Sequence, residues 1–259
     1  MVQSSLLYEN ISPDLFGQLL NKYGDLLESI SSAKPAKQGQ RTLSELDEFR
    51  YKTAVELFSS EKPQRAMQHN DVKSLVEWKL RHGKFRPTLM KLVSSNDEDT
   101  VADTLEGAMS AYWKAPDVTK AVDAIAKLKG IGPATASLLL SVHDPDKVIF
   151  FSDEAFYWLC HDAKPGPIKY NAKEYRDLNA SAQKLAKRLD VSATDVEKVA
   201  FVLMRTNHDD VVFPRQEPPL PVSRSDDTSS EEGGNKRKFQ KERDEITPPQ
   251  LRRSKRGKT

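Results

Sequence analysis

The chain has 259 residues, with 40 Lys and Arg against 38 Asp and Glu, a formal net charge of +2 and one cysteine, Cys160. One cysteine excludes a disulfide framework, a thiolate-ligated iron–sulfur cluster and a cysteine-based zinc site, so we expect a buried structural thiol. No apolar run reaches the roughly 18 to 20 residues of a membrane helix, and the first residues lack the pattern of a secretory signal. We therefore expect a protein inside the cell, with no membrane partner.

The chain divides into three parts by composition. Residues 1–42 are predicted to form a short N-terminal segment and a polar linker, because "SSAKPAKQGQR" at 31–41 interrupts the apolar pattern. Residues 43–213 are predicted to form one all-α domain, a bundle of about eight or nine helices, because apolar residues recur there at helical spacing. Only "KVIFF" at 147–151 would suit a strand.

Capping residues indicate where the first helices begin and end. Ser44 is the expected N-cap of the first helix in this domain, and Asp71 is the expected cap of the second. Gly83 is expected to end that second helix. The remaining helices are predicted over 87–95, 98–113, 117–128, 133–142, 153–162, 171–189 and 193–207.

The stretch "EWKLRHGKFRP" at 77–87 mixes basic and aromatic side chains. Such a mixture suits contact with a nucleic-acid backbone and stacking on an extruded base, and we select Lys84, Phe85 and Arg86 as candidate DNA contacts. The alternative is an ordinary helix end with solvated cations. We expect Trp78 to lie in the core.

The stretch "LKGIGPATASLLL" at 128–140 places two glycines between two apolar helical patterns. Pro133 suits the first turn of the second helix, where its missing N–H costs nothing. Glycines at 130 and 132 leave backbone N–H groups unshielded at a helix N-terminus, where an anion such as phosphate is favoured. The alternative is a tight connector in which the glycines only permit close packing.

This pattern resembles the helix-hairpin-helix motif, which grips one backbone phosphate of DNA without reading bases. The matching residues are Leu128, Gly130, Ile131, Gly132, Thr135 and Ala136, with Ile131 expected to plug into the core. The resemblance implies a grip on duplex DNA and a possible monovalent cation at the carbonyls of Leu128 and Gly130, with no other metal and no cofactor. The implied DNA contacts are Lys129, Gly130, Ile131, Gly132, Ala134 and Thr135.

After the hairpin (117–142) come a Pro-containing loop and a helix that starts at Asp153, together spanning 143–162. This order resembles the helix-hairpin-helix DNA glycosylase superfamily of base-excision repair. The resemblance implies that Asp153 is the catalytic carboxylate, which stabilises positive charge on the sugar as the base leaves. Glu154 is the fallback. The alternative is that "SDEAF" is only a capped helix start, with Ser152 or Asp153 as N-cap.

Ala134 stands where family members with lyase activity carry lysine, nineteen residues before Asp153. The resemblance therefore implies, if the protein is an enzyme, a monofunctional glycosylase without β-lyase activity. The loop "HDPD" and the lead-in "FFSD" depart from the family pattern. Two other functions stay open: a catalytically inactive DNA-binding or complex-forming module and, more weakly, a protein-interaction helical domain.

Residues 214–259 are predicted to be a disordered basic tail, because they are rich in Pro, Ser and charge. They hold twelve Lys and Arg against eight Asp and Glu, which leaves the folded part near neutral. Two basic clusters resemble a bipartite nuclear-localisation signal, so we expect a nuclear monomer that binds an import receptor through this tail. The cluster residues are Lys236, Arg237, Lys238, Arg252, Arg253, Lys255 and Arg256.

Overall fold

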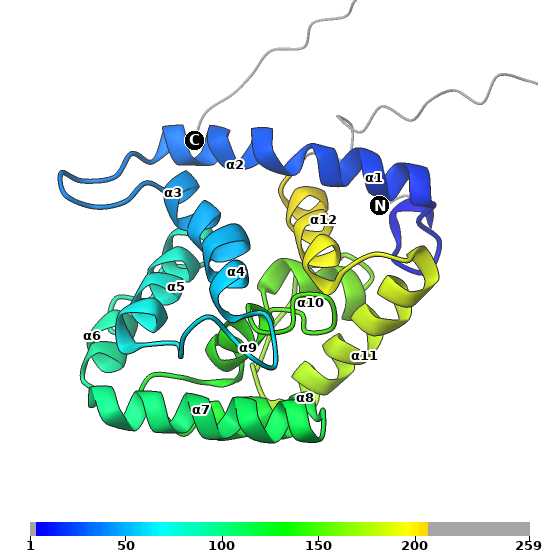
Figure 1. Cartoon of the computed structure of the whole chain (residues 1–259). Coiled ribbons are helices and arrows are strands. Elements are labelled where there is room, and N and C mark those ends of the chain that lie inside the picture. Colours follow the sequence, from blue (N-terminus) through cyan, green and yellow to red (C-terminus); the bar gives the residue numbers. More distant parts are fainter. Residues whose placement is uncertain (1–3, 207–259) are drawn as a thin grey trace, which may run out of the picture. The chain divides into compact units, whose positions relative to one another are not determined.

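The structure, a computed structural model, describes residues 4–206. These residues form an all-helical fold without a strand, as the sequence predicted (Figure 1). None of the described helices is both long and apolar enough to cross a membrane. The predicted disordered tail and its nuclear-localisation residues lie outside the described residues.

Long connections, 142–152 and 161–171, flank α10. In Figure 1, α1 and α2 run along one side of the described residues and α7 along the opposite side. The elements are η1 Ser4–Leu6, α1 Pro13–Asn21, α2 Tyr23–Ala33, α3 Leu43–Glu48, η2 Phe49–Thr53, α4 Ala54–Phe58, α5 His69–His82, α6 Leu89–Ser94, α7 Glu98–Lys114, α8 Val118–Ile125, α9 Pro133–Ser141, α10 Asp153–Cys160, α11 Ala172–Leu189 and α12 Ala193–Arg205.

Two predicted helix caps are wrong. The cap of α3 is Thr42 rather than Ser44, because its hydroxyl accepts from the Glu45 amide while the Glu45 carboxylate accepts from the Thr42 amide. This reciprocal pair supplies acceptors for the Thr42 and Glu45 amides, which a cap at Ser44 would leave without partners. Asp71 lies inside the first turn of α5, where it accepts from the Gln68 amide. Gly83 ends α5, as predicted.

Residues 148–151 of the segment 147–151 are buried but form no strand with any described residue, and Lys147 is exposed in the preceding turn. A strand needs a neighbour to satisfy its amides, and this segment runs alone between α9 and α10. The Phe151 amide instead donates to the Ser137 hydroxyl of α9, at 2.9 Å. The segment thus carries the chain through the core from the hairpin to Asp153.

The N-terminal residues belong to the same core, which the sequence did not predict. Helices α1 and α2 pack against α12 and bury Leu15, Phe16 and Leu19. The indole N–H of Trp158 in α10 donates to the Leu6 carbonyl at 2.8 Å. Residues that looked like a separate segment therefore support the helix that Asp153 begins.

A buried ion pair lies at the centre of the fold. The Arg50 guanidinium is 2.8 Å from a carboxylate oxygen of Glu197, and both side chains are at most 3% exposed. The Arg50 guanidinium also lies 4.2 Å from the ring centroid of Tyr51 and 4.1 Å from that of Trp78. The π-helical turn η2 contributes Arg50, and such a turn shifts the register of side chains along a helix.

A column of stacked rings leads from this ion pair to Phe201 of α12. Trp78 is fully buried, as predicted, and stacks on His82, which stacks on Phe201 with ring centroids 4.0 Å apart. Burial lowers the pKa of His82 well below its ordinary value, and the nearby Arg50 and Arg205 lower it further. The ring therefore stays uncharged at neutral pH and packs as an aromatic residue.

Candidate active site and nucleic-acid interface

The glycine turn joins α8 and α9 as a helical hairpin. Leu128 and Ile131 are buried, so Ile131 plugs into the core as predicted. Gly130 has a φ of +77°, and a Cβ at this position would lie 2.8 Å from the Cβ of Leu92 in α6. Both the left-handed backbone and the close approach of α6 therefore require glycine here.

Replacement of Gly130 by alanine is expected to destabilise the protein by about 1–3 kcal/mol, because it adds left-handed strain to overpacking. Urea denaturation of both proteins measures the difference. The control is Gly107→Ala on the exposed face of α7, where an added Cβ meets no atom within 4 Å. Alanine is the better helix former there, so this control should be neutral or stabilising. Equal stability of Gly130→Ala and the wild type would contradict the packing account.

Gly132 is not explained by packing. It is exposed, its φ is −95°, and a Cβ added there would meet no atom within 4 Å. No described residue accepts a hydrogen bond from the amides of Gly130, Gly132 or Ala134. These three amides lie at the start of α9, where the helix dipole favours an anion.

Asn96 holds the turn in place, and sequence reasoning missed it. Its side-chain oxygen accepts from the Lys129 amide at 2.8 Å, and its side-chain nitrogen donates to the Lys129 carbonyl at 2.9 Å. The Lys129 amide is therefore occupied, while the Lys129 side chain is exposed. The signal available in the sequence was the position of Asn96, a polar residue directly before the acidic residues that begin α7.

Asp153 opens α10 without capping it. The Ser152 hydroxyl accepts from the Ala155 amide at 3.0 Å and is the N-cap. The Asp153 carboxylate is half-buried and accepts a hydrogen bond of 2.6 Å from the Tyr170 hydroxyl. Of the two capping residues considered from the sequence, the structure selects Ser152, and the Asp153 carboxylate is left available for another role.

Tyr170 is the second functional candidate that the sequence did not indicate. It lies in the irregular segment before α11 and has a φ of +54°, a left-handed conformation that costs a non-glycine residue roughly 1–2 kcal/mol. The Arg86 guanidinium lies 5.3 Å from its ring centroid. Burial and the bond to Asp153 raise the pKa of Tyr170, so it stays a donor at neutral pH.

Asp153 lines two neighbouring cavities, of about 180 and 450 Å³. Both cavities are also lined by Lys84, Arg86 and Tyr170, so the contact between Arg86 and Tyr170 lies where they meet. The smaller cavity is lined by Ala134 of the hairpin as well. The structure therefore brings the predicted carboxylate to the same cavity as the start of α9.

Thr135 and Glu154 have partners that the sequence did not predict. Thr135 is buried, and its hydroxyl accepts from the Lys79 ammonium, so it lies inside the protein rather than on the exposed turn. The Glu154 carboxylate forms an ion pair of 2.6 Å with Arg205, which also donates to the His82 carbonyl. Glu154 thus ties α10 to α12, and among the described residues that line this cavity Asp153 is the one carboxylate left for chemistry.

No family model, curated protein or solved structure matches the chain. The resemblance to the glycosylase superfamily therefore depends on the motif residues alone. No group of three or more His, Cys, Asp or Glu side chains suited to a metal occurs in residues 4–206. The Leu128 carbonyl, considered for a monovalent cation, accepts from the Ile131 amide at 3.1 Å.

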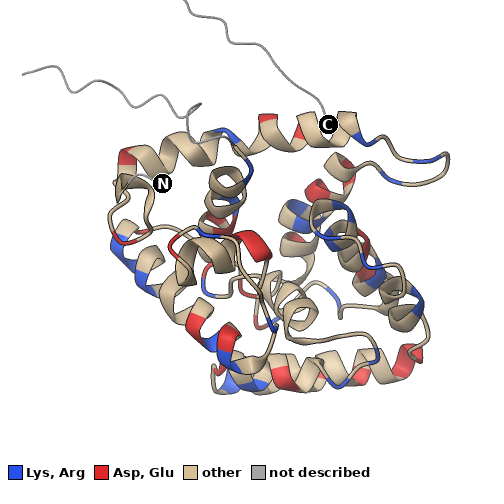
Figure 2. Ribbon diagram, turned by 180° about the vertical axis from the view of Figure 1, so that it is seen from behind, with Lys and Arg blue, Asp and Glu red and all other residues tan. Residues whose placement is uncertain are grey.

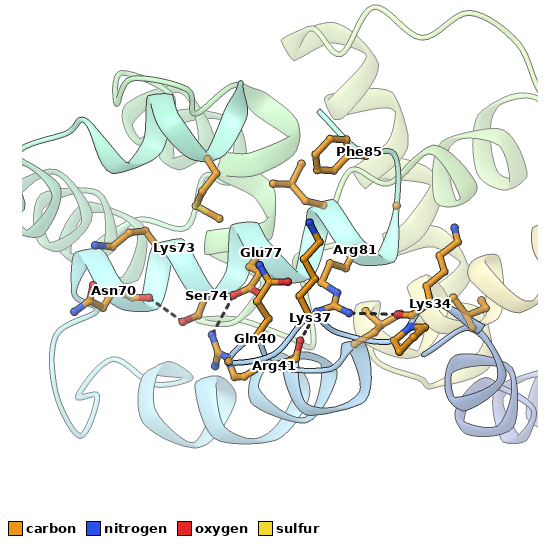
Figure 3. Close-up of a pocket in the computed structure, with 17 residues that line it drawn as sticks. Lys34, Lys37, Gln40, Arg41, Asn70, Lys73, Ser74, Glu77, Arg81 and Phe85 are labelled. Atoms are coloured by element: carbon orange, nitrogen blue, oxygen red, sulfur yellow. Dashed lines mark hydrogen bonds and ion pairs between the residues drawn. The ribbon is translucent and has the colours of Figure 1, made fainter. Parts of the chain in front are cut away.

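A larger groove, of about 1030 Å³, is shown in Figure 3, and Gly83 lines both this groove and the small cavity. Figure 2 shows Lys and Arg in the loop that follows α2, which forms one wall of this groove. Phe85 is 69% exposed and lines the groove. Among the described residues that line the groove, Glu77 is the only acidic one, and it lies 3.8 Å from Arg41. The basic residues that line it are Lys34, Lys37, Arg41, Lys73 and Arg81.

Proposed function

We propose that this chain binds duplex DNA through the hairpin and hydrolyses the N-glycosidic bond of a base flipped out of the helix. The observation that carries the proposal is the cavity that Asp153 and Ala134 line together, at a turn where the amides of Gly130, Gly132 and Ala134 have no acceptor among the described residues. A phosphate on those amides would hold the DNA backbone next to the carboxylate.

Asp153 would perform the chemistry in this cavity. Loss of a base leaves positive charge on the sugar, and a fixed carboxylate stabilises that charge. The Tyr170 hydroxyl fixes one carboxylate oxygen, which leaves the other to face the sugar or to orient a water molecule. The left-handed backbone of Tyr170 supports this role, because strained residues cluster at functional sites.

The basic groove offers a path for the DNA beside the extruded nucleotide. Lys34, Lys37 and Lys73 line it and form no ion pair with any residue in the range 4–206. Cations of this kind supply sequence-independent affinity for a phosphate backbone. Phe85 is exposed at the same groove and is suited to stack on a base or fill the gap that the flipped base leaves.

One observation favours the second candidate, an inactive DNA-binding module. The cavity of about 180 Å³ is smaller than the roughly 300–1,000 Å³ of ordinary ligand pockets. Arg86 lies over Tyr170 between this cavity and its neighbour. An active enzyme must part these two side chains to admit a nucleotide, whereas a binding module has no need to do so.

Replacement of Gly132 by glutamate is expected to weaken duplex binding about tenfold or more. The added carboxylate would repel the phosphate and cost at least one charge-assisted hydrogen bond of about 1.5–3 kcal/mol. The substitution fits the backbone without strain, so stability should be unchanged. Titration of a labelled duplex at fixed salt measures the affinity.

The matched control is Gly107→Glu, which makes the same change on the exposed face of α7. It should lower affinity far less, since α7 carries no part of the proposed interface. Equal losses in both variants would show that only net charge matters and would contradict a grip at the hairpin. Absence of binding by the wild-type protein would instead favour a protein-interaction domain.

A further inference from the structure

The Lys79 side chain reaches the hairpin next to Ala134, the position without an amine. It extends from α5, and its ammonium donates to the Thr135 hydroxyl at 2.9 Å, one residue from Ala134. The side chain lines the small cavity together with Ala134 and Asp153. Lys79 forms no ion pair with a described residue, so neither its charge nor its position is explained by a structural salt bridge.

The surroundings of Lys79 lower the pKa of its amine. Burial and, to a smaller extent, the Arg86 guanidinium lower the pKa of its amine to about 8, while the Asp153 carboxylate opposes both effects. The other charged groups that line the cavity are Lys84, Glu154 and Arg205, of which the last two pair with each other. An amine must lose its proton before it attacks a carbonyl carbon, so a lowered pKa makes Lys79 a better nucleophile near neutral pH.

We propose that Lys79 is the nucleophile of a second activity, cleavage of the DNA strand at an abasic deoxyribose. The inference rests on the proposed function, because base excision produces this sugar in the same cavity. It replaces the expectation, drawn from Ala134, that the chain lacks lyase activity.

The proposed strand cleavage is an elimination, with no net oxidation or reduction. The neutral Lys79 amine adds to C1′ of the ring-opened sugar aldehyde, and protonation with loss of one water gives an iminium ion. Asp153 removes a proton from C2′, the C3′–O bond breaks, and the 3′ phosphate leaves with the bonding electron pair. Water then hydrolyses the conjugated imine, which releases an unsaturated aldehyde on the DNA and returns the Lys79 amine.

Reductive trapping tests this assignment on the full-length protein. A duplex with one preformed abasic site is incubated with the protein and sodium cyanoborohydride, and the covalent adduct is separated on a denaturing gel. Peptide mass spectrometry then locates the modified lysine. The variants are Lys79→Arg, which keeps the charge, and Lys79→Met, which keeps the length. The control is Lys91→Arg on the exposed face of α6.

We expect the wild type and Lys91→Arg to form an adduct on Lys79. The two Lys79 variants should form no more adduct than a reaction without protein. Thermal melts show which variants are folded, and a mobility shift shows which of them bind the abasic duplex. Binding without an adduct, an adduct on another lysine, or an adduct retained in a folded Lys79 variant would each overturn the assignment. Failure of the wild type to bind any duplex would overturn the proposed function and this inference together.

Discussion

Replacement of Asp153 by asparagine should reduce base excision about 10²- to 10⁴-fold, the usual contribution of a positioned acid–base or charge-stabilising group. The amide keeps the size of the carboxylate and still accepts from the Tyr170 hydroxyl. It removes the negative charge that stabilises the sugar cation. Single-turnover excision on one damaged duplex measures the rate, with enzyme in excess over DNA.

Duplex affinity should change little in this variant, because the hairpin amides supply the phosphate grip. Glu154→Gln is the matched control for the chemistry, since it changes the neighbouring carboxylate that pairs with Arg205. It should retain excision in the fraction that is folded. Equal excision rates in Asp153→Asn and the wild type would exclude Asp153 as the catalytic carboxylate.

Replacement of Glu197 by glutamine should lower the free energy of unfolding by about 3–5 kcal/mol, because it leaves a buried cation without its counter-charge. Arg50 cannot discard its proton, and its buried Nε and Nη1 atoms have no hydrogen-bond partner among the described residues. The facing rings of Tyr51 and Trp78 compensate only part of the charge. Urea denaturation followed by circular dichroism measures the loss.

The matched control is Glu48→Gln, which removes an exposed ion pair with Lys52 one helical turn away. That change should cost about 0.5 kcal/mol or less, as exposed helical pairs do. The double variant Arg50→Met, Glu197→Leu should recover much of the loss, because it removes the unpaired charge itself. A cost below about 1 kcal/mol for Glu197→Gln would contradict the account of the buried pair.

The hairpin was predictable from sequence because its determinants are local. Leu128 and Ile131 flank Gly130, and these three residues lie within four positions of one another. The start of α10 at Asp153 followed equally from its capping serine. The contacts around Asp153 were not predictable, because Tyr170 comes from an irregular segment that has no periodic pattern.

Lys79 shows what helix periodicity alone could have revealed. It lies three and four residues after Val76 and Leu75, both fully buried, and therefore falls on the apolar face of α5. A lysine on such a face points into the protein and is a candidate for a perturbed pKa. Its contact with Thr135 joins residues 56 positions apart, which only the packing of α5 on α9 establishes.

The burial of Arg50 could not be predicted from the sequence, for a different reason. A regular helix over residues 43–58 would keep one register, whereas η2 interrupts it with a π-helical turn. The extra residue in that turn places Arg50 in the core next to Glu197. Nothing in the local pattern distinguishes this arginine from an exposed one.

Excision of a base from duplex DNA is the most direct test of the proposed function. The full-length protein is incubated with duplexes that each carry one damaged or mismatched base, and alkali then converts any abasic site into a strand break. We expect strand breaks after alkali at one or more of these bases with the wild-type protein, and about 10²- to 10⁴-fold slower formation of these breaks with Asp153→Asn. Absence of cleavage on every duplex, or equal cleavage by the variant, would contradict the proposal that this cavity removes bases.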